Sequence, residues 1–219
     1  MDKKNSVVIN VLRKAGVVFW DFDGVIKDSV EVKTQAFVKL FTSYGDEITG
    51  KVKDHHEANG GMSRFKKIPL YLEMAGQEVS DELVDSMCDR FSMLVFDGVI
   101  NADWIPGVEN YLRTNPYDQR FVLVSATPQS ELEVIVDRLN LAKHFNRIYG
   151  APISKTFAIR ESLISLSITP YDALMIGDAS ADQEASEANK VPFLLRRHAS
   201  NCKVFADYQG LSINDFSEI

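Results

Sequence analysis

The chain has 219 residues, of which 45% are hydrophobic and 25% are charged, and its net charge at pH 7 is −7. This length and composition suit a globular protein with one well-buried core and a smaller subdomain. An acidic balance argues against non-specific binding to nucleic acid or anionic membranes, and no apolar run approaches the roughly 20 residues of a membrane helix. We therefore expect a cytoplasmic protein without a nucleic-acid or membrane partner.

The first strand is predicted from the apolar run at 17–20, which ends in Asp21-Phe22-Asp23-Gly24. Residues two apart on an extended chain point to the same side, so both carboxylates can converge on one cation. Gly24 allows a sharp backbone turn directly after them. Taken alone, the pattern also fits the metal–nucleotide motif of sugar transferases or an ordinary acidic end of a strand.

Residues 29–104 show helical periodicity and no strand alternation. Apolar residues recur at helical spacing at Val32, Ala36, Leu40 and Tyr44, at Phe65, Ile68, Leu72 and Ala75, and at Leu83, Met87, Phe91 and Leu94. A segment of this length is not a loop, so we predict a helical subdomain inserted after the first strand. Asp97-Gly98 is interpreted as a turn where this subdomain returns to the core.

From about residue 106 onward, helices and strands are predicted to alternate. The expected strands are 120–125, 145–149, 171–177 and 191–195, and the expected helices are 106–114, 128–140, 155–166 and 181–189, with Thr127 as the N-cap of the second helix. This alternation predicts an α/β fold, a Rossmann-like parallel sheet core with helices on both faces. We expect residues 1–28 and 105–219 to form the core and residues 29–104 to form the inserted helical cap.

Polar residues follow three further predicted strands or open the helices after them. Ser125-Ala126 offers a hydroxyl and a backbone N–H at a helix N-terminus, a natural site for an anion. Lys155 lies in the first turn of its helix, where the macrodipole disfavours a cation, so we expect it to have an anionic partner. Asp178 and Asp182 are four residues apart and share one face of their helix. Ligands of such sheets bind at the carboxyl ends of the strands.

In this order, the four segments resemble the four motifs of the haloacid dehalogenase-like superfamily, and the resemblance covers nearly the whole chain. It implies a phosphatase in which Asp21 attacks phosphorus while Asp23 protonates the leaving oxygen and then activates water. Lys155 would screen the Asp21 carboxylate from the phosphate, which Ser125 and the N–H of Ala126 would bind. The resembled dehalogenases lack an acid at the position of Asp23, which argues against carbon–halogen cleavage.

The resemblance also implies Mg²⁺ as the cofactor. Asp21, the carbonyl of Asp23 and Asp178 would coordinate it directly, and Asp182 would orient a bound water or Lys155. Hard oxygen ligands of this kind suit Mg²⁺, which is usually held by one or two carboxylates and a substrate phosphate. An acidic metal site without covalent chemistry is the alternative for this set.

In the cap, Gly61-Met62-Ser63-Arg64 resembles the substrate-specificity loop of β-phosphoglucomutases. This resemblance implies that Gly61, Ser63 and Arg64 contact a sugar phosphate, and a guanidinium suits planar phosphate or carboxylate recognition. The chain departs from those mutases at Lys33, where they carry a histidine, and at Gly177, where they carry a glutamate. Both departures favour a phosphatase.

Two further polar clusters lie outside these motifs. His56, with His55 and Lys67, either flanks the substrate opening of the cap or is an exposed helix residue. Residues 196–198, Arg-Arg-His, are interpreted as a solvated loop at the rim of the site.

The leading interpretation is therefore a magnesium-dependent phosphatase of a small phosphorylated metabolite: a sugar phosphate, a sugar acid phosphate or a phosphoglycolate-like compound. A phosphosugar mutase would use the same Asp21 and Asp23 but retain the phosphate. A receiver-type signalling domain lacks an inserted cap, and a sugar transferase would carry its Asp-x-Asp well inside a nucleotide-binding domain. The sequence leaves the substrate open and is compatible with a monomer or a homodimer.

Overall fold

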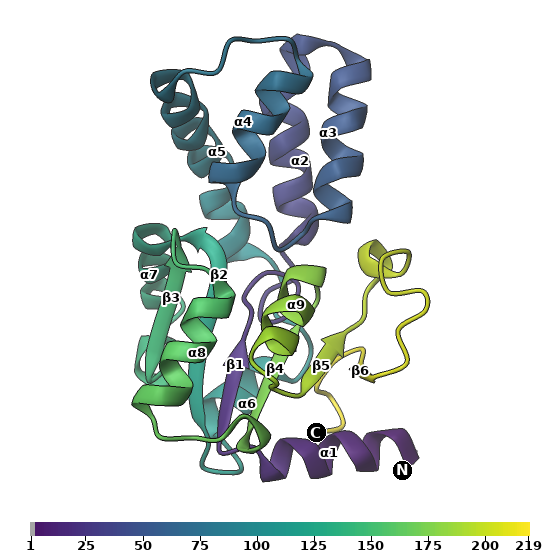
Figure 1. Cartoon of the computed structure of the whole chain (residues 1–219), viewed down its shortest axis with the longest axis vertical. Coiled ribbons are helices and arrows are strands. Elements are labelled where there is room, and N and C mark those ends of the chain that lie inside the picture. Colours follow the sequence, from purple (N-terminus) through teal and green to yellow (C-terminus); the bar gives the residue numbers. More distant parts are fainter. Residues whose placement is uncertain (1–2) are drawn as a thin grey trace.

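A six-stranded parallel sheet with the strand order β3-β2-β1-β4-β5-β6 lies at the centre of the core (Figure 1). The computed structural model describes residues 3–219. The strands are β1 Val17–Trp20, β2 Arg120–Pro128, β3 Arg147–Ala151, β4 Ala173–Gly177, β5 Phe193–Arg196 and β6 Leu211–Ile213. All neighbouring strands pair in parallel, which confirms the predicted α/β sheet. The short strand β6 was not anticipated from the sequence.

Strand β1 lies between β2 and β4 and is buried on both faces, so it reads as a continuous apolar run rather than an alternation. Val18 and Trp20 belong to one hydrophobic cluster, and Val17 and Phe19 belong to the other. The first cluster includes residues of α1 Lys3–Lys14, α6 Val108–Thr114 and α7 Gln129–Arg138, and the second those of α8 Lys155–Ser165 and α9 Ser180–Ala188. Helices therefore cover both faces, as predicted; α1 is an unanticipated addition.

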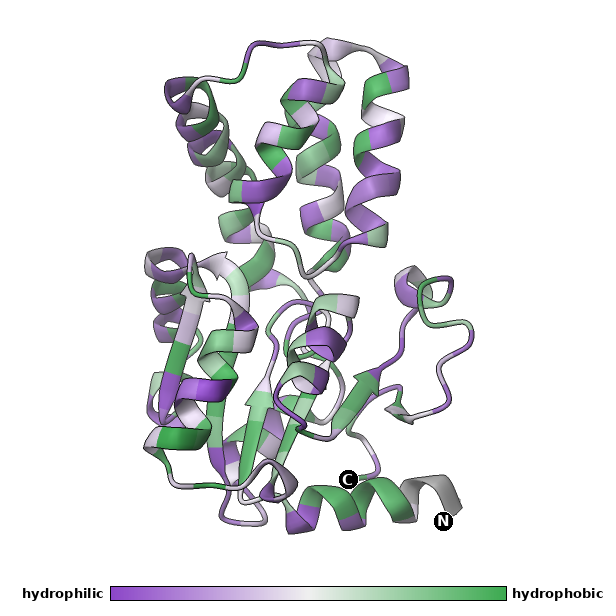
Figure 2. Cartoon of the chain, in the orientation of Figure 1, coloured by the Kyte–Doolittle hydropathy of each residue, from purple (hydrophilic) through white to green (hydrophobic). Residues whose placement is uncertain are grey.

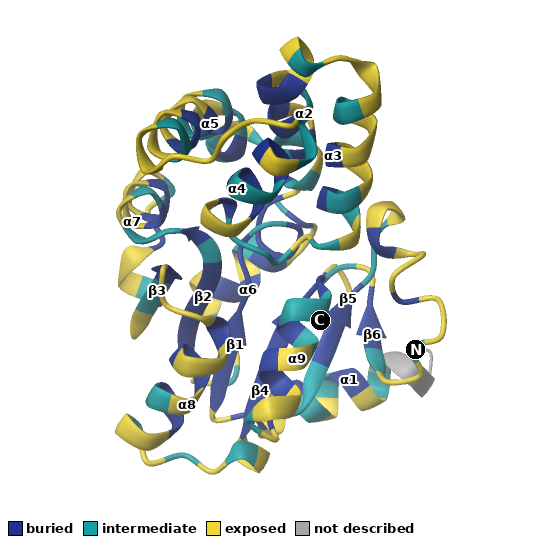
Figure 3. Ribbon diagram, turned by 45° about the horizontal axis from the view of Figure 1, so that its top comes forward, coloured by how far each residue is buried: buried dark blue, intermediate teal, exposed yellow. Residues whose placement is uncertain are grey.

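Four helices lie beyond the carboxyl ends of the strands (Figure 1). They are α2 Val30–Phe41, α3 Asp46–Ala58, α4 Arg64–Met74 and α5 Asp81–Asn101, and we call this helical layer the cap. The ring of Phe37 lies at its centre, with ring centroids 4.1 Å from Phe91 and 5.5 Å from Tyr71. Buried and apolar positions line the inward sides of these helices, while their outer sides are exposed and polar (Figures 2 and 3).

The two chain segments that join cap and core run side by side. The backbone N–H of Asp28 donates to the carbonyl of Asp103 at 2.8 Å, and Lys27 forms an isolated bridge with Trp104. These contacts fall at the predicted cap boundaries of 29 and 104, although the division into domains stays a prediction. Residues 1 and 2 of the predicted core lie outside the described residues. Short 3-10 helices at Thr42–Tyr44, Ala142–His144, Pro170–Asp172 and Ala199–Asn201 occupy connecting segments.

Three local predictions were wrong. Asp97-Gly98 is not a turn but lies inside α5, where a Cβ on Gly98 would lie 2.7 Å from a methyl group of Val32 in α2. Thr127 is not an N-cap, because β2 continues to Pro128 and α7 begins only at Gln129. Phe65 is exposed rather than part of an apolar stripe.

Within residues 3–219, no helix combines the length and the apolar character that a membrane crossing requires. Cys88 and Cys202 are both free thiols.

Candidate active site

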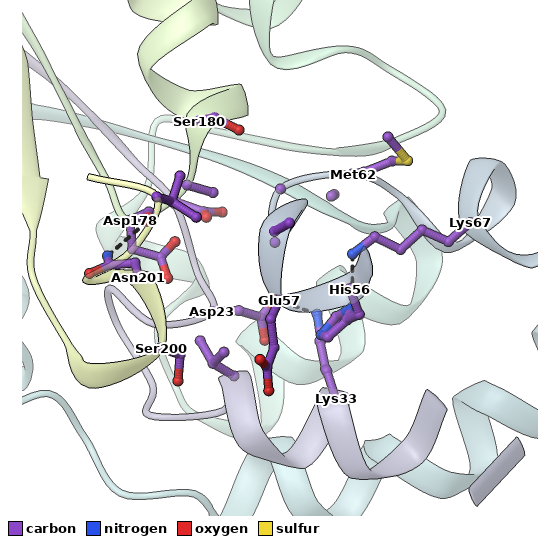
Figure 4. A pocket seen from close by; sticks show the side chains of 18 of the residues that line it. Asp23, Lys33, His56, Glu57, Met62, Lys67, Asp178, Ser180, Ser200 and Asn201 are labelled. Atoms are coloured by element: carbon purple, nitrogen blue, oxygen red, sulfur yellow. Dashed lines mark hydrogen bonds and ion pairs between the residues drawn. The ribbon is translucent and has the colours of Figure 1, made fainter. Parts of the chain in front are cut away.

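One pocket lies between the carboxyl ends of the strands and the cap (Figure 4). Five of the predicted core residues line it: Asp21, Asp23, Ala126, Lys155 and Asp178. Asp182 is fully buried beside Lys155 and is not among the described residues that line the pocket. Ser125 is also buried and outside that set. Ser125 and Ala126 lie within β2 and not at the predicted helix N-terminus, because α7 begins only at Gln129. The Ser125 hydroxyl accepts a hydrogen bond from the N–H of Thr127 at 3.2 Å.

Lys155 connects two of the buried acids. Its ammonium lies 2.8 Å from Asp21 Oδ1 and donates to Asp182 Oδ1 at 2.6 Å. Burial alone would lower the pKa of Lys155, but the carboxylates of Asp182 and Asp21 hold it above its ordinary value. Burial, followed by the charge of Asp182, raises the pKa of Asp21 to about 7 against the opposing effect of Lys155. Lys155 therefore stays charged, and Asp21 depends on nearby cations for its ionised form.

Asp23 has a different set of partners. Ser29 Oγ donates to its Oδ1 at 2.6 Å, and the ammonium of Lys33 forms an ion pair with its Oδ2. Lys33 also donates to Thr127 Oγ1 at 2.9 Å. Burial acts to raise the pKa of Asp23, but Lys33 and Ser29 outweigh it, so the pKa is lowered. This network was not predicted, because Lys33 stood out in the sequence only as a departure from the mutases and Thr127 only as a helix N-cap.

Asp21, Asp178 and Asp182 form a buried acidic cluster in which one oxygen from each lies within 4.8 Å of the others. Asp182 is engaged on both oxygens, because Lys155 contacts Oδ1 and the N–H groups of Asp178 and Ala179 donate to Oδ2 at 3.3 and 3.1 Å. Asp178 faces the pocket, and burial raises its pKa. This arrangement leaves Asp21 and Asp178 as the more available pair of ligands.

Two glycines permit the close packing of these acids. Gly24 has a φ of +73°, and a Cβ there would lie 2.2 Å from Asp178 Oδ2. A Cβ on Gly177 would lie 2.3 to 2.7 Å from the side chain of Asp182. Any larger residue at either position would displace an acid of the cluster.

The segment at 196–198 is not the solvated loop that the sequence predicted. Arg196 ends β5, is buried, and donates to the carbonyl of Gly24 at 3.2 Å. His198 lines the pocket with Nε2 2.8 Å from Asp178 Oδ2, and Asn201 donates to the Asp178 carbonyl at 2.9 Å. The contacts of His198 and Asn201 with Asp178 were not predicted, because both residues follow the last predicted strand without a recognisable motif.

Arg64 of the cap is tied to the core. Its guanidinium forms a bidentate ion pair with Glu131 of α7 at 2.7 and 2.9 Å, and it also contacts Ser92 of α5 and the ring of Phe91. The side chains of Arg64 and Glu131 are only 3% and 10% exposed. Arg64 lines the pocket, but its predicted contact with substrate would compete with Glu131 and stays a prediction.

The other predicted cap residues lie in different surroundings. Gly61 lines the pocket and packs against α9, where a Cβ on it would lie 2.7 Å from that of Ala181. Ser63 directly precedes α4 and is not among the described residues that line the pocket. His56 is buried and lines the pocket, whereas His55 is half-buried and lies against Tyr71. The alternative that His56 is an exposed helix residue is therefore wrong.

The family model of the haloacid dehalogenase-like hydrolases matches residues 18–195, and the chain belongs to this family. The match begins in β1 and ends in β5, so it includes all four core motifs and the cap.

The chain is similar to curated proteins and to solved structures. It is 23% identical to phosphoglycolate phosphatase 1 of Pseudomonas aeruginosa over 78% of its own length and 65% of that protein, so it spans just under two thirds of this relative. It is 23% identical to a phosphorylated carbohydrates phosphatase of Thermotoga maritima, covering 78% of the chain and 80% of the relative.

Among solved structures, β-phosphoglucomutase from Clostridium difficile has a TM-score of 0.74 at 21% identity, with 94% of this chain and 93% of that chain covered. CbbY from Rhodobacter sphaeroides, in complex with xylulose-(1,5)bisphosphate, has a TM-score of 0.75 at 13% identity, with 93% and 96% covered. These similarities show the shared fold.

Proposed function

We propose that the protein is a Mg²⁺-dependent phosphatase that hydrolyses a small phosphorylated metabolite through an aspartyl-phosphate at Asp21. The observation that carries this proposal is the convergence of Asp21, Asp23, Lys155 and Asp178 on one pocket under the cap. Phosphoryl transfer requires a nucleophilic carboxylate, a second acid close to the leaving oxygen, a lysine in a fixed position and oxygen ligands for a metal ion.

The proposed reaction has two steps. A carboxylate oxygen of Asp21 bonds to phosphorus while the bond from phosphorus to the leaving oxygen breaks, and that oxygen takes a proton from Asp23. Against the effect of burial, Lys33 and Ser29 lower the pKa of Asp23, so this step requires Asp23 to be protonated when the substrate is bound. Asp23 then takes a proton from water, whose oxygen attacks phosphorus and releases Asp21 and inorganic phosphate. Lys155 fixes the Asp21 carboxylate. Ala126 lines the pocket, and its backbone N–H would bind a phosphoryl oxygen.

The donor set fits a hard divalent cation. Asp21, Asp178 and Asp182 present buried carboxylate oxygens within 4.8 Å of one another, and burial raises the pKa of all three. A cation between them would favour their ionised forms. Asp21 and Asp178 would hold Mg²⁺, with Asp182 orienting Lys155, and the bound ion would neutralise phosphoryl charge.

The relatives support a phosphorylated small molecule as the substrate. Phosphoglycolate phosphatase 1 and the phosphorylated carbohydrates phosphatase are both named for such substrates. The cap closes over the pocket, which favours a metabolite over a phosphorylated protein.

A phosphosugar mutase remains the second candidate, because the Gly61–Arg64 tetrad and the fold of β-phosphoglucomutase match. Two contacts favour hydrolysis. The side chain of Asp182 fills the space at Gly177 where the mutases carry a glutamate, and Lys33 pairs with Asp23 where they carry a histidine.

Release of inorganic phosphate from a panel of phosphorylated metabolites with Mg²⁺ tests the proposal. We expect turnover with Mg²⁺, none with EDTA, and no requirement for a sugar bisphosphate. Isomerisation of a sugar phosphate without phosphate release would favour the mutase.

A further inference from the structure

Lys67 is a buried lysine at the cap side of the pocket. It belongs to α4, is 1% exposed, and lines the same pocket as Asp23. Its ammonium lies 2.8 Å from Nδ1 of His56 on α3, the contact drawn in Figure 4. The ring of Phe37 is the other neighbour of this ammonium, with its centroid 5.6 Å away. Of the two places that the sequence allowed for Lys67, the substrate opening or an exposed helix surface, the structure supports the first.

Apart from His56, the other cationic or imidazole side chains that line the pocket each have a carboxylate partner. They pair as Lys33 with Asp23, Lys155 with Asp21 and Asp182, Arg64 with Glu131, and His198 with Asp178. Among the described residues, Lys67 forms no such ion pair. Glu57, the acid that the cap contributes to the pocket, lies 3.8 Å from Lys53 instead.

An unpaired buried ammonium is unfavourable for the fold. Burial, reinforced by the charge of Lys33, lowers the pKa of Lys67 to about 7. Burial and the charge of Lys67 lower the pKa of His56 to about 2, so the ring is neutral and its Nδ1 accepts from the ammonium. A neutral ring orients the ammonium but supplies no counter-charge. An anion that enters the pocket would supply that charge.

We propose that Lys67, oriented by His56, binds a second anionic group on the substrate, a carboxylate or a further phosphate on the leaving-group portion. This inference rests on the proposed phosphatase function and adds the substrate class to it. Asp23, which would protonate the leaving oxygen, lines the same pocket, so the leaving group extends from Asp23 toward the cap. Lys67 is then a specificity residue.

The test uses pairs of phosphate esters that differ in one anionic group. 2-Phosphoglycolate is compared with 2-hydroxyethyl phosphate, 3-phosphoglycerate with glycerol 3-phosphate, and glucose 1,6-bisphosphate with glucose 6-phosphate. The first two pairs measure the effect of an added carboxylate on turnover, and the third measures the effect of an added phosphate. We expect the wild-type protein to prefer the anionic member of at least one pair by about 10- to 100-fold in kcat/KM, the effect of one hydrogen bond to a charged group.

Lys67→Gln should remove this preference, mainly through KM, and leave the neutral member within about twofold of wild type. Lys66→Gln is the matched control, because Lys66 is the adjacent lysine of α4 and is exposed. It should leave both members unchanged. A thermal unfolding curve for each variant checks the fold.

Two results would overturn the inference. One is equal kcat/KM of the wild-type protein for both members of every pair, a comparison that is made without any variant. The other is a folded Lys67→Gln protein that loses the same factor on both members, which would make Lys67 a structural residue. Absence of phosphate release from every substrate, including a generic aryl phosphate, would instead contradict the proposed phosphatase function itself.

Discussion

Core and cap both bury charged side chains around the pocket, but they balance them differently. In the core, Lys155 lies between Asp21 and Asp182, and each charge has an opposite partner within 2.8 Å. In the cap, the ammonium of Lys67 lies against the neutral ring of His56 and the ring of Phe37. The lysine of the core is therefore paired with carboxylates of the protein, whereas the lysine of the cap has no carboxylate partner among the described residues.

This difference suits two separate roles, with the core residues carrying out the reaction and Lys67 of the cap selecting the substrate. Paired charges held by strand ends are preorganised for a reaction that is the same for every phosphate ester. An unpaired cation in the cap adds affinity only when the substrate brings the missing charge. Changes in the core should consequently affect all substrates, and changes at Lys67 should affect anionic ones.

The largest effect is expected for the proposed nucleophile. Asp21→Asn should lower kcat by at least about 10⁴-fold on every phosphate ester, because an amide is a poor nucleophile. Phosphate release by the purified variant measures this. Asp97→Asn is the control and should retain full activity, because Asp97 lies inside α5, outside the described residues that line the pocket. Substantial turnover by a folded Asp21→Asn protein would remove Asp21 from the chemistry.

Substitutions of Asp178, which follows β4, and of Asp182 in α9 should change the Mg²⁺ requirement to different extents. Asp178→Asn is expected to raise the Mg²⁺ concentration for half-maximal activity by about 10- to 100-fold, as loss of a ligand or its partner does. Asp182→Asn should change the Mg²⁺ requirement less and the melting temperature more, because Asp182 holds Lys155 and two backbone N–H groups. Titration of Mg²⁺ against activity, together with thermal unfolding, compares the variants. A larger change in the Mg²⁺ requirement for Asp182→Asn than for Asp178→Asn would instead make Asp182 the direct ligand.

The Arg64–Glu131 pair joins cap and core, so its loss should resemble a core change. Glu131→Gln leaves a buried guanidinium without its partner, at a cost of about 3–5 kcal/mol. We expect Glu131→Gln to lower the melting temperature and to reduce kcat/KM about tenfold on anionic and neutral esters alike. Arg64→Met should have a similar effect. The loss of stability in the double variant should be smaller than the sum of the two single losses. Glu133→Gln, an exposed change on the same helix, is the control. Selective loss on anionic esters in Arg64→Met alone would support Arg64 as a substrate contact.

The smallest expected effect is a pH dependence of selectivity. Because the pKa of Lys67 is lowered to about 7, its charge is present below that pH and is lost as the pH rises through it. The ratio of kcat/KM for 2-phosphoglycolate over 2-hydroxyethyl phosphate should therefore fall by about tenfold between about pH 6 and about pH 9. The reacting phosphate is common to both, so its titration cancels. A flat ratio in the wild type, like that expected for Lys67→Gln, would contradict a charged Lys67 as the selector.

Most of the core could be predicted from local pattern. The buried run of β1 and the Asp21–Gly24 turn are contiguous in sequence, and each later motif follows a predicted strand or opens the helix after it. Parallel strands present their carboxyl ends at one edge, so the order of motifs is enough to bring them together. By contrast, β6 has only three residues, and α1 precedes the first motif.

The cap was harder to predict because its important contacts are tertiary. Lys66 and Lys67 are neighbours in sequence, and only the packing of α4 against α3 buries one of them. The buried positions of α4 follow helical spacing, but two of them, Arg64 and Lys67, are cations. A pattern of apolar residues alone therefore predicted Phe65 as a buried position instead. The partner of Arg64 lies 67 residues away in α7, which no local pattern indicates.

The central claim is covalent catalysis by Asp21, and trapping the intermediate tests it most directly. The protein is mixed with 2-phosphoglycolate and Mg²⁺, quenched in acid within the first turnover, digested and measured by mass spectrometry, with Asp21→Asn treated in parallel. We predict one added phosphoryl group on the peptide that contains Asp21, and none in the variant. Rapid phosphate release without that adduct, or an adduct on a different residue, would contradict the account.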